Sequence, residues 1–224
     1  MPSKLSGNAL KIIAAISMFI DHMGLMLFPQ NLIFRHIGRL AFPIFAFMIA
    51  EGCKYTRNRL RYWGGLTALA LVCQIVYYVF DGSLYLSILV TFSLSILTIY
   101  ALDRLKAAPG PLNVLIFTAA VVGVYWLNQV FRIDYGFWGC MAPVFAAVLH
   151  NTKYDTLSAR VAVFGVGLTL LSLSHGSIQS RCLLALPLLL CYSGKRGKHK
   201  MKYFFYIFYP AHLVLLEGIA LLIS

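Results

Sequence analysis

Long apolar stretches, separated by short polar segments, run through the whole chain. A helix of about 20 apolar residues crosses a hydrocarbon core of about 30 Å. Nine windows of this kind are predicted to form membrane-spanning helices, at residues 9–28, 37–53, 61–80, 84–103, 112–131, 135–150, 157–174, 179–193 and 203–223. The sixth and eighth windows are short, so tilted, half-buried or re-entrant segments are alternatives there.

Turn residues separate the windows, and no segment indicates a second domain. Asp81-Gly82-Ser83, Pro109-Gly110-Pro111 and Ser193-Gly194 lie between predicted helices, where Gly and Pro are expected. The sequence shows no long linker, low-complexity run or internal repeat. We therefore expect residues 1–224 to form one domain, an all-α integral membrane bundle of about nine transmembrane helices.

The amino-acid composition also indicates that the protein is surrounded by lipid. Hydrophobic residues make up 60% of the chain and charged residues 12%, and the mean hydropathy is +0.80. A soluble domain carries about 25% charged and about 45–50% apolar residues. A soluble fold of this size could not bury so much apolar surface.

The positive charges alternate between the predicted connections, which tests the number of spans independently. Fifteen of the nineteen cations lie on one predicted side, namely Lys4, Lys11, Lys54, Arg57, Arg59, Arg61, Arg104, Lys106, Lys153, Arg160, Lys195, Arg196, Lys198, Lys200 and Lys202. The other side holds Arg35, Arg39, Arg132 and Arg181. Because cytoplasmic loops are enriched in Lys and Arg, we predict a cytoplasmic N-terminus and an external C-terminus.

The net charge of +12 requires no nucleic-acid partner, since basic loops at an anionic inner leaflet account for it. The run from Lys195 to Lys202 could also attract a polyanionic cosubstrate. The five cysteines show no CxxC or metal-ligand spacing and fall in or beside predicted helices, where cysteine acts as a small apolar residue. We predict neither a disulfide nor a metal site.

Ionisable residues inside membrane helices are costly and are therefore candidates for function. The predicted helices contain few of them: Asp21, His22, His36, Arg39, Glu51, Arg181, His212 and Glu217. With the predicted orientation, the first, second and ninth helices bring such groups to overlapping depths in the membrane. Interhelical hydrogen bonds are the alternative explanation, but two adjacent titratable residues near mid-membrane favour a reaction site.

Lys11 and His22 share one face of the first helix. Eleven residues at about 100° each complete three turns plus about 20°, and they separate the two positions by about 16 Å. Lys11 is predicted at the cytoplasmic mouth and His22 deep in the membrane. An extended cosubstrate with an anionic head could lie along that face, although lysine is also common at membrane entrances because it snorkels.

Two blocks of sequence carry a family resemblance. LSGNALKIIAAISMFIDHMGLMLF followed by FRHIGRLAFPIFAFMIAEG resembles the TraX family of membrane proteins, and FYIFYPAHL is similar to the C-terminal signature of that family. These blocks cover residues 5–52 and 203–213, about a quarter of the chain. The helices between them match only in hydropathy.

The resemblance implies an acetyltransferase. TraX proteins are associated with N-terminal acetylation of the pilin subunit of conjugative pili, and they resemble integral-membrane acyltransferases that modify cell-surface sugars. Those enzymes carry a basic residue, ten others and then His on the first helix, which is Lys11-x10-His22 here, with Lys where the relatives more often have Arg. The resemblance implies acetyl-CoA as cytoplasmic cosubstrate, an amine or hydroxyl acceptor on a protein, glycan or small molecule, and location in the bacterial cytoplasmic membrane.

The chemistry of a thioester assigns roles to the candidate residues. Acyl transfer from a thioester needs a general base and stabilisation of an oxyanion. We predict His22 as the base, with Asp21 neutralising Arg39 or accepting a hydrogen bond from His36. The residues that could supply donors to the oxyanion or orient the acceptor are Arg39, His36, Tyr209 and His212. Lys11 would hold a CoA phosphate, with Arg57, Arg59 or Arg61 as candidate additional ligands. Pro43 and Pro210 could open backbone polar groups toward the site.

Other ionisable residues have simpler interpretations. Glu51 is predicted to pair with nearby cations at the cytoplasmic boundary, and His150, His175 and His199 to be loop or interfacial residues.

Two other functions remain open. A proton-coupled transporter or flippase could use the same intramembrane Asp, His and Arg residues as a relay, although the chain lacks an inverted repeat. A non-catalytic scaffold would leave the titratable residues unexplained. The sequence does not identify the acceptor, the acyl chain length, the oligomeric state, a covalent or direct transfer, or a role in conjugation.

Overall fold

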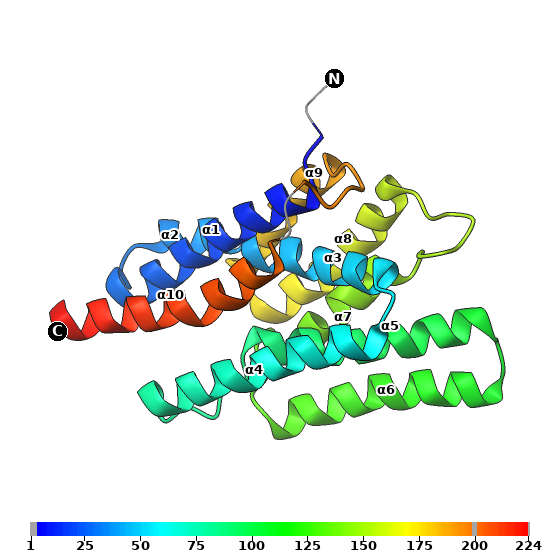
Figure 1. Ribbon diagram of the computed structural model, residues 1–224, viewed down its shortest axis with the longest axis horizontal. Helices are drawn as coiled ribbons and strands as arrows, with labels where there is room; N and C mark the ends of the chain where they lie inside the picture. Colours follow the sequence, from blue (N-terminus) through cyan, green and yellow to red (C-terminus); the bar gives the residue numbers. More distant parts are fainter. Residues whose placement is uncertain (1–3, 199–200, 224) are drawn as a thin grey trace.

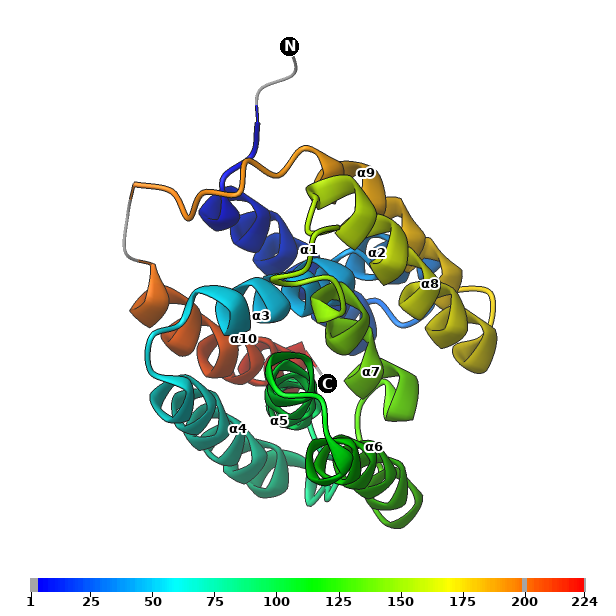
Figure 2. The same ribbon diagram turned by 90° about the vertical axis from the view of Figure 1, so that its right-hand side faces the viewer.

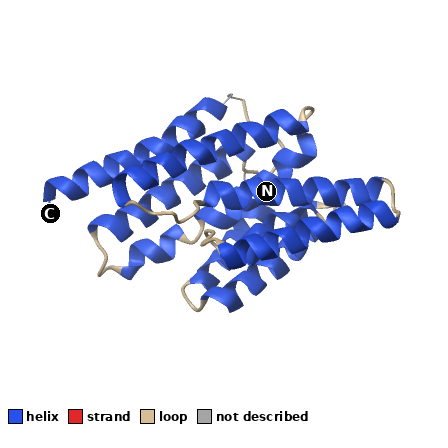
Figure 3. Cartoon of the chain, turned by 90° about the horizontal axis from the view of Figure 1, so that it is seen from below, coloured by secondary structure: helices blue, strands red, loops and turns tan. Residues whose placement is uncertain are grey.

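Helices follow the predicted apolar windows closely. The computed structural model describes residues 4–198 and 201–223, and this part of the chain contains no β-strand (Figure 3). The helices are α1 (Gly7–Leu27), α2 (Leu32–Gly38), α3 (Ala41–Tyr55), α4 (Arg59–Asp81), α5 (Ile88–Ala107), α6 (Pro111–Val130), α7 (Gly136–Ala147), α8 (Leu157–His175), the 3-10 helix η1 (Gln179–Leu184), α9 (Ala185–Leu190) and α10 (Lys202–Ile223) (Figure 1). The predicted all-α architecture is confirmed.

Within the described residues, seven helical segments are long and apolar enough to cross a membrane, with α2 and α3 together forming one of them. The two windows that were short in the sequence, 135–150 and 179–193, contain only the apolar helices Gly136–Ala147 and Gln179–Leu190. Twelve helical residues extend about 18 Å, which is less than the hydrocarbon thickness of about 30 Å. Eight of the nine residues from Gly139 to Ala147 are buried, so α7 belongs to the core of a multi-pass membrane protein.

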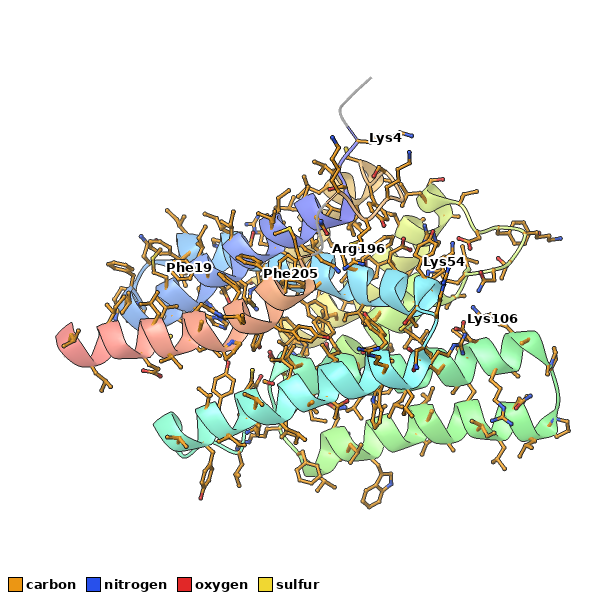
Figure 4. All side chains as sticks on the ribbon, in the orientation of Figure 1. Lys4, Phe19, Lys54, Lys106, Arg196 and Phe205 are labelled. Carbon is orange, nitrogen blue, oxygen red and sulfur yellow. The ribbon has the colours of Figure 1, made fainter. Side chains whose placement is uncertain are left out.

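Several of the segments that connect the helices contact one another at one end of the bundle. Lys54 pairs with Asp155, Arg59 pairs with Asp103, and the amide of Gly7 donates to the carbonyl of Lys195. These contacts gather the segments that were predicted on the cytoplasmic side, and Figure 4 shows Lys4, Lys54, Lys106 and Arg196 toward the right of the view. These basic connections, which were predicted to share one side, therefore lie together at one end of the bundle. Which end faces the cytoplasm remains a prediction.

Helix α3 lies inside the bundle. It packs against α1, α5, α7 and η1, and Figure 2 shows it between α1 above and α4 and α5 below. Its side chains Ile44 and Phe47 are fully buried, and Phe47 meets Phe164 of α8 edge to face. Helix α10 lies at the periphery, where it packs against α1 and α4. The five cysteines are free. A central α3 and a peripheral α10 enclose the space in which the candidate residues meet.

Candidate active site

Helix α1 carries Asp21 and His22 toward its C-terminal end. The helix begins where the Ser6 hydroxyl accepts a hydrogen bond from the amide of Ala9 at 3.2 Å, as a helix N-cap does. Adjacent helical positions point about 100° apart. Asp21 therefore faces α2, while His22 faces α10, and the structure gives the two residues different partners.

Glycines allow α1 and α2 to approach each other closely. A Cβ atom at Gly38 would overlap the Asp21 carboxylate, and a Cβ atom at Gly24 would overlap the side chain of Phe34. Because α1 and α2 are in contact at both positions, the Asp21 carboxylate is buried against the end of α2. Asp21 thus reaches its cationic partners because α1 and α2 lie in close contact, and only glycine at position 38 permits this contact.

Asp21 is bound by two arginines. Arg35 Nη1 donates to Asp21 Oδ2 at 2.8 Å, and Arg39 Nη2 donates to Asp21 Oδ2 at 2.9 Å and to Oδ1 at 3.1 Å. The predicted neutralisation of Arg39 by Asp21 is therefore present, with Arg35 as a second cation. We call these three residues the Asp21 cluster. One carboxylate beside two guanidinium groups leaves the cluster with an excess of one positive charge.

A proline explains why Arg39 lies at the end of a helix. The window 37–53 was predicted as one helix, but α2 ends at Gly38 and α3 begins at Ala41. Pro43 has no amide to pair with the carbonyl of Arg39 four residues earlier, and its ring excludes that carbonyl from a continuous helix. The break fits the expectation that Pro43 opens the backbone near the site.

Arg39 also contacts elements from later in the chain. Its Nη1 donates to Gln179 Oε1 of η1 at 3.0 Å, and its guanidinium lies 5.8 Å from the ring centre of Tyr135. The Nε atom of Arg39 is buried and has no hydrogen-bond partner among the described residues. Arg39 therefore joins three segments and keeps one buried N–H donor.

His22 meets His212 of α10. The His22 Nδ1 and His212 Nε2 atoms are 2.8 Å apart, and His212 Nδ1 is 2.9 Å from the carbonyl oxygen of Phe208. The ring of His212 stacks on Phe208, and Tyr209 meets it edge to face at 5.6 Å between centroids. Three predicted site residues, His22, Tyr209 and His212, are thus brought together.

One cavity of about 1670 Å³ connects the two ends of the bundle. At one end it is lined by Lys11, Arg61 and Arg196. At the other end it is lined by His22, the Asp21 cluster and the loop between α6 and α7 that contains Asp134. The cavity wall between these ends is largely apolar and aromatic, with side chains from α3, α4 and α10. A long ligand could extend from the basic end to His22.

The predicted phosphate-binding residues separate into two groups. Lys11 and Arg61 line the cavity. Arg59 instead pairs with Asp103 at 3.0 Å and lies over the ring of Tyr100, and Arg57 is exposed outside the cavity lining. Arg196, which was predicted only as part of a basic run, joins Lys11 and Arg61.

His36 does not take the predicted place beside Asp21. The Asp21 carboxylate accepts hydrogen bonds from Arg35 and Arg39, and His36 Nδ1 is buried without a hydrogen-bond partner in the described part of the chain. His36 is also outside the cavity lining. Among the residues that the structure describes, no group of three or more His, Cys, Asp or Glu side chains is arranged to hold a metal ion.

Sequence reasoning missed four residues of the site: Arg35, Asp134, Tyr135 and Gln179. The spacing of Arg35 and Arg39, four residues apart, places both on one helix face and could have identified Arg35. The other three lie at helix ends far along the chain, where no local pattern marks them. Asp134 accepts a hydrogen bond from the Tyr85 hydroxyl at 2.8 Å. Burial raises the pKa of Asp134, against the effects of Tyr85 and Arg39, and so favours its neutral form.

A second buried cluster lies at the end of the bundle where α3 ends. Arg160 donates to Glu51, and the same guanidinium is 3.1 Å from Asp155, which also accepts from Lys54 at 2.7 Å. His150 Nε2 is 3.3 Å from Arg160 Nη1. We call these five residues the Glu51 cluster. The predicted pairing of Glu51 with cations is confirmed.

The remaining histidines differ from one another. His150 follows α7, as a loop residue was expected to do, but it is buried within the Glu51 cluster. His175 is exposed at the C-terminal end of α8. His199 lies outside the described residues.

Comparison with known proteins places the chain in a family. No solved structure matches it. The chain is 28% identical over 239 residues to a protein of Dichelobacter nodosus named "Probable fimbrial assembly protein FimC, serogroup H1", and the match covers 94% of each chain. A 40-residue segment is 55% identical to an uncharacterized protein of Rickettsia prowazekii (strain Madrid E), covering 18% of this chain and 16% of that one. Residues 6–220 match the family described as TraX protein. The chain therefore belongs to the TraX family.

Proposed function

We propose that this protein is a membrane-embedded acyltransferase that moves an acetyl group from acetyl-CoA to an amine or hydroxyl acceptor. The observation that carries the proposal is the cavity that joins Lys11, Arg61 and Arg196 to His22. An acyl-CoA has an anionic nucleotide at one end and a thioester at the other. A basic site and an imidazole at opposite ends of one cavity suit that molecule.

The basic end of the cavity fits the donor. Lys11 supplies a compact charge and Arg61 and Arg196 supply planar donor forks, which together suit phosphate oxygens. We assign phosphate binding to these three residues. Arg59 is excluded because its guanidinium is already paired with Asp103, and Arg57 because it is exposed outside the cavity.

His22 is the general base of the proposed reaction. The acceptor amine or hydroxyl must lose a proton as it attacks the thioester carbonyl. A neutral imidazole can accept that proton near pH 7. His22 is the imidazole of α1 that lines the cavity and lies on the same helix face as Lys11.

The Asp21 cluster stabilises the oxyanion of the proposed intermediate. Two arginines beside one carboxylate retain a net positive charge, and Arg39 Nε is a buried donor without a partner among the described residues. Fixed donors and charges in a site sheltered from water stabilise negative charge as it develops. Arg39 is the group of the cluster that we assign to the oxyanion.

The acceptor is proposed to be the N-terminus of a pilin-like protein in the bacterial cytoplasmic membrane. The name of the Dichelobacter nodosus relative refers to fimbrial assembly, and fimbriae are built from pilin subunits. A glycan or small-molecule acceptor is the alternative within the same chemistry.

A proton-coupled transporter or flippase is the second candidate, because the cavity reaches both ends of the bundle. A transporter would move a labelled solute across liposomes without forming a covalent product. The two functions therefore predict different fates for a labelled acetyl group.

The test uses the full chain in liposomes with acetyl-labelled CoA and either a peptide amine or a sugar acceptor. Wild type is expected to transfer the label, and His22→Ala to lose roughly 100- to 10,000-fold in kcat. Ile16→Ala, on an exposed position of the same helix, is the matched control and should retain kcat. Full turnover by His22→Ala, or no label transfer by wild type, would reject the proposal.

The donor end has a separate test. Arg61→Ala is expected to raise the KM for acetyl-CoA about tenfold while changing kcat little. The substitution removes an interaction with acetyl-CoA that is equally strong in the ground state and in the transition state. Arg104→Ala, an exposed arginine of α5 outside the cavity, is the matched control. Equal KM values for both variants would contradict the assignment of the basic end.

A further inference from the structure

Two imidazoles and one carbonyl form a chain of hydrogen bonds between α1 and α10. His22 Nδ1 and His212 Nε2 are 2.8 Å apart, and His212 Nδ1 and the Phe208 carbonyl oxygen are 2.9 Å apart. Both distances are within the range of ordinary hydrogen bonds. Each of these two hydrogen bonds needs one donor and one acceptor, and the carbonyl oxygen fixes the two roles in one of them.

The carbonyl of Phe208 determines the direction of the chain. A carbonyl oxygen only accepts, so His212 Nδ1 must carry the hydrogen of the bond to Phe208. In a neutral imidazole the other nitrogen then has a lone pair and no hydrogen. His212 Nε2 is therefore the acceptor, and His22 Nδ1 is the donor.

The same logic leaves His22 Nε2 as the free base. Since His22 donates from Nδ1, its neutral ring carries no hydrogen on Nε2. His22 lines the cavity, so Nε2 is the nitrogen available to a substrate. A hydrogen bond on one ring nitrogen commonly decides which tautomer a histidine adopts.

The surroundings of His212 hold its ring in this orientation. His212 is 3% exposed, and its ring stacks on Phe208 with 12° between the planes and 5.1 Å between the centroids. Tyr209 meets the same ring in an edge-to-face arrangement, with 83° between the planes. The helix that carries all three residues packs on α1. His212 is thus a buried acceptor with a defined direction toward His22.

We propose that His212 is a positioning residue that fixes His22 as the Nδ1–H tautomer, so that Nε2 of His22 is the atom that accepts the proton of the acceptor. This role rests on the proposed acyl transfer. It differs from the role that the sequence indicated for His212, which was donation to the oxyanion or orientation of the acceptor.

The proton transfers balance for an amine acceptor. The amine nitrogen attacks the thioester carbon, a C–N bond forms, and the carbonyl π electrons move to oxygen. His22 Nε2 takes a proton from the attacking nitrogen. The oxyanion electrons then re-form the C=O bond as the C–S bond breaks, and the proton on His22 passes to the departing sulfur, which leaves as the thiol of CoA. Throughout, His22 Nδ1–H keeps donating to His212 Nε2, and this bond strengthens while His22 is cationic.

Two variants separate the acceptor role of His212 from its packing. His212→Gln places a side-chain carbonyl oxygen where Nε2 was, and His212→Phe keeps the ring but removes the acceptor. We expect His212→Phe to lose roughly 100-fold in kcat with little change in the KM for acetyl-CoA, and His212→Gln to recover most of that loss. Ile207→Phe, at an exposed position of the same helix and outside the cavity lining, is the matched control and should retain kcat. Equal kcat for wild type and His212→Phe would overturn the role.

A spectroscopic readout keeps the test independent of activity. In wild-type protein with ¹⁵N-labelled histidine, the signals of His22 are identified by their loss in His22→Gln. They are expected to show hydrogen on Nδ1, and His212→Phe should shift His22 toward the Nε2–H form. Hydrogen on Nε2 of His22 in wild type would overturn the inference even if acetyl transfer were observed. If acetyl transfer fails but the tautomer responds to His212, only the proposed function is rejected.

Discussion

The Asp21 cluster and the Glu51 cluster both pair carboxylates with cationic side chains, but they differ in charge balance. In the Glu51 cluster two carboxylates face two cations, Arg160 and Lys54. In the Asp21 cluster one carboxylate faces two arginines. A balanced buried cluster satisfies its own charges, whereas an unbalanced one retains positive charge that a ligand can use.

Their surroundings differ in the same way. All three members of the Asp21 cluster line the large cavity, beside His22. In the Glu51 cluster only Glu51 lines it, and the other members join α3, α8 and the loop after α7. Two properties of a buried ionic cluster therefore bear on its function. One is whether its charges cancel, and the other is whether it lines a cavity. By both criteria the Asp21 cluster is the one that we propose to act in the reaction.

Breaking the balanced cluster should have the largest effect on stability. Arg160→Met leaves Glu51 buried without its strongest partner, and we expect a loss of roughly 3–5 kcal/mol in unfolding free energy. The measurement is denaturant unfolding in detergent. The double variant Glu51→Met with Arg160→Met should recover most of this loss, because no buried charge remains unpaired. Arg104→Met, at an exposed position, should change stability by no more than about 0.5 kcal/mol.

Breaking the unbalanced cluster should affect catalysis instead. Arg39→Met is expected to lower kcat roughly 100- to 1,000-fold, equivalent to about 2.7–4 kcal/mol of transition-state stabilisation. Stability should fall less than in Arg160→Met, because Asp21 keeps Arg35 as a partner. Arg39→Lys should be intermediate, since lysine keeps the charge but loses the planar fork. A normal kcat in Arg39→Met would contradict the comparison.

The glycine contact offers a smaller perturbation of the same cluster. Gly38→Ala introduces a methyl group where the Asp21 carboxylate lies, and we expect it to cost roughly 1–3 kcal/mol in stability. It should also lower kcat, because α2 and both arginines shift relative to His22. Gly64→Ala, where an added Cβ meets nothing within 4 Å, is the matched control. A Gly38→Ala protein with wild-type stability and kcat would show that the close contact is unnecessary.

The smallest expected effect is the acid sensitivity of the Glu51 cluster. Burial acts to raise the pKa of Asp155, but the hydrogen bonds from Lys54 and the Asn151 amide lower it overall. Because the folded-state pKa lies below the ordinary value, this stabilisation is present above that value and is lost as the pH falls through the folded-state pKa. Lys54→Met should therefore lose less stability than wild type in acid, by up to about 1 kcal/mol. Thermal unfolding at neutral and acidic pH measures this, and identical acid losses would contradict it.

The local pattern was sufficient for the helices but not for the site. Apolar windows predicted each segment within a few residues, because a membrane helix must satisfy its backbone internally whatever its neighbours are. The second window was the exception, since Pro43 divides it at Arg39. Asp21 and His22 were identified because an ionisable pair in an apolar helix is conspicuous. The partnership of His22 with His212, 190 residues away, depends on packing between helices and has no local signal.

The sequence by itself was sufficient to predict an all-α membrane protein. It also showed the alternation of the basic connections and identified the residues that carry charge into the bundle. It did so because lipid imposes length, hydropathy and charge rules on each segment separately. Only the tertiary structure decided that Arg35 joins Arg39 on Asp21, that Arg196 replaces Arg57 and Arg59 at the basic end, and that His36 stands apart. These choices depend on how each helix is rotated and how closely it approaches its neighbours. Such quantities arise from side-chain packing between distant segments, so no single stretch of sequence contains them.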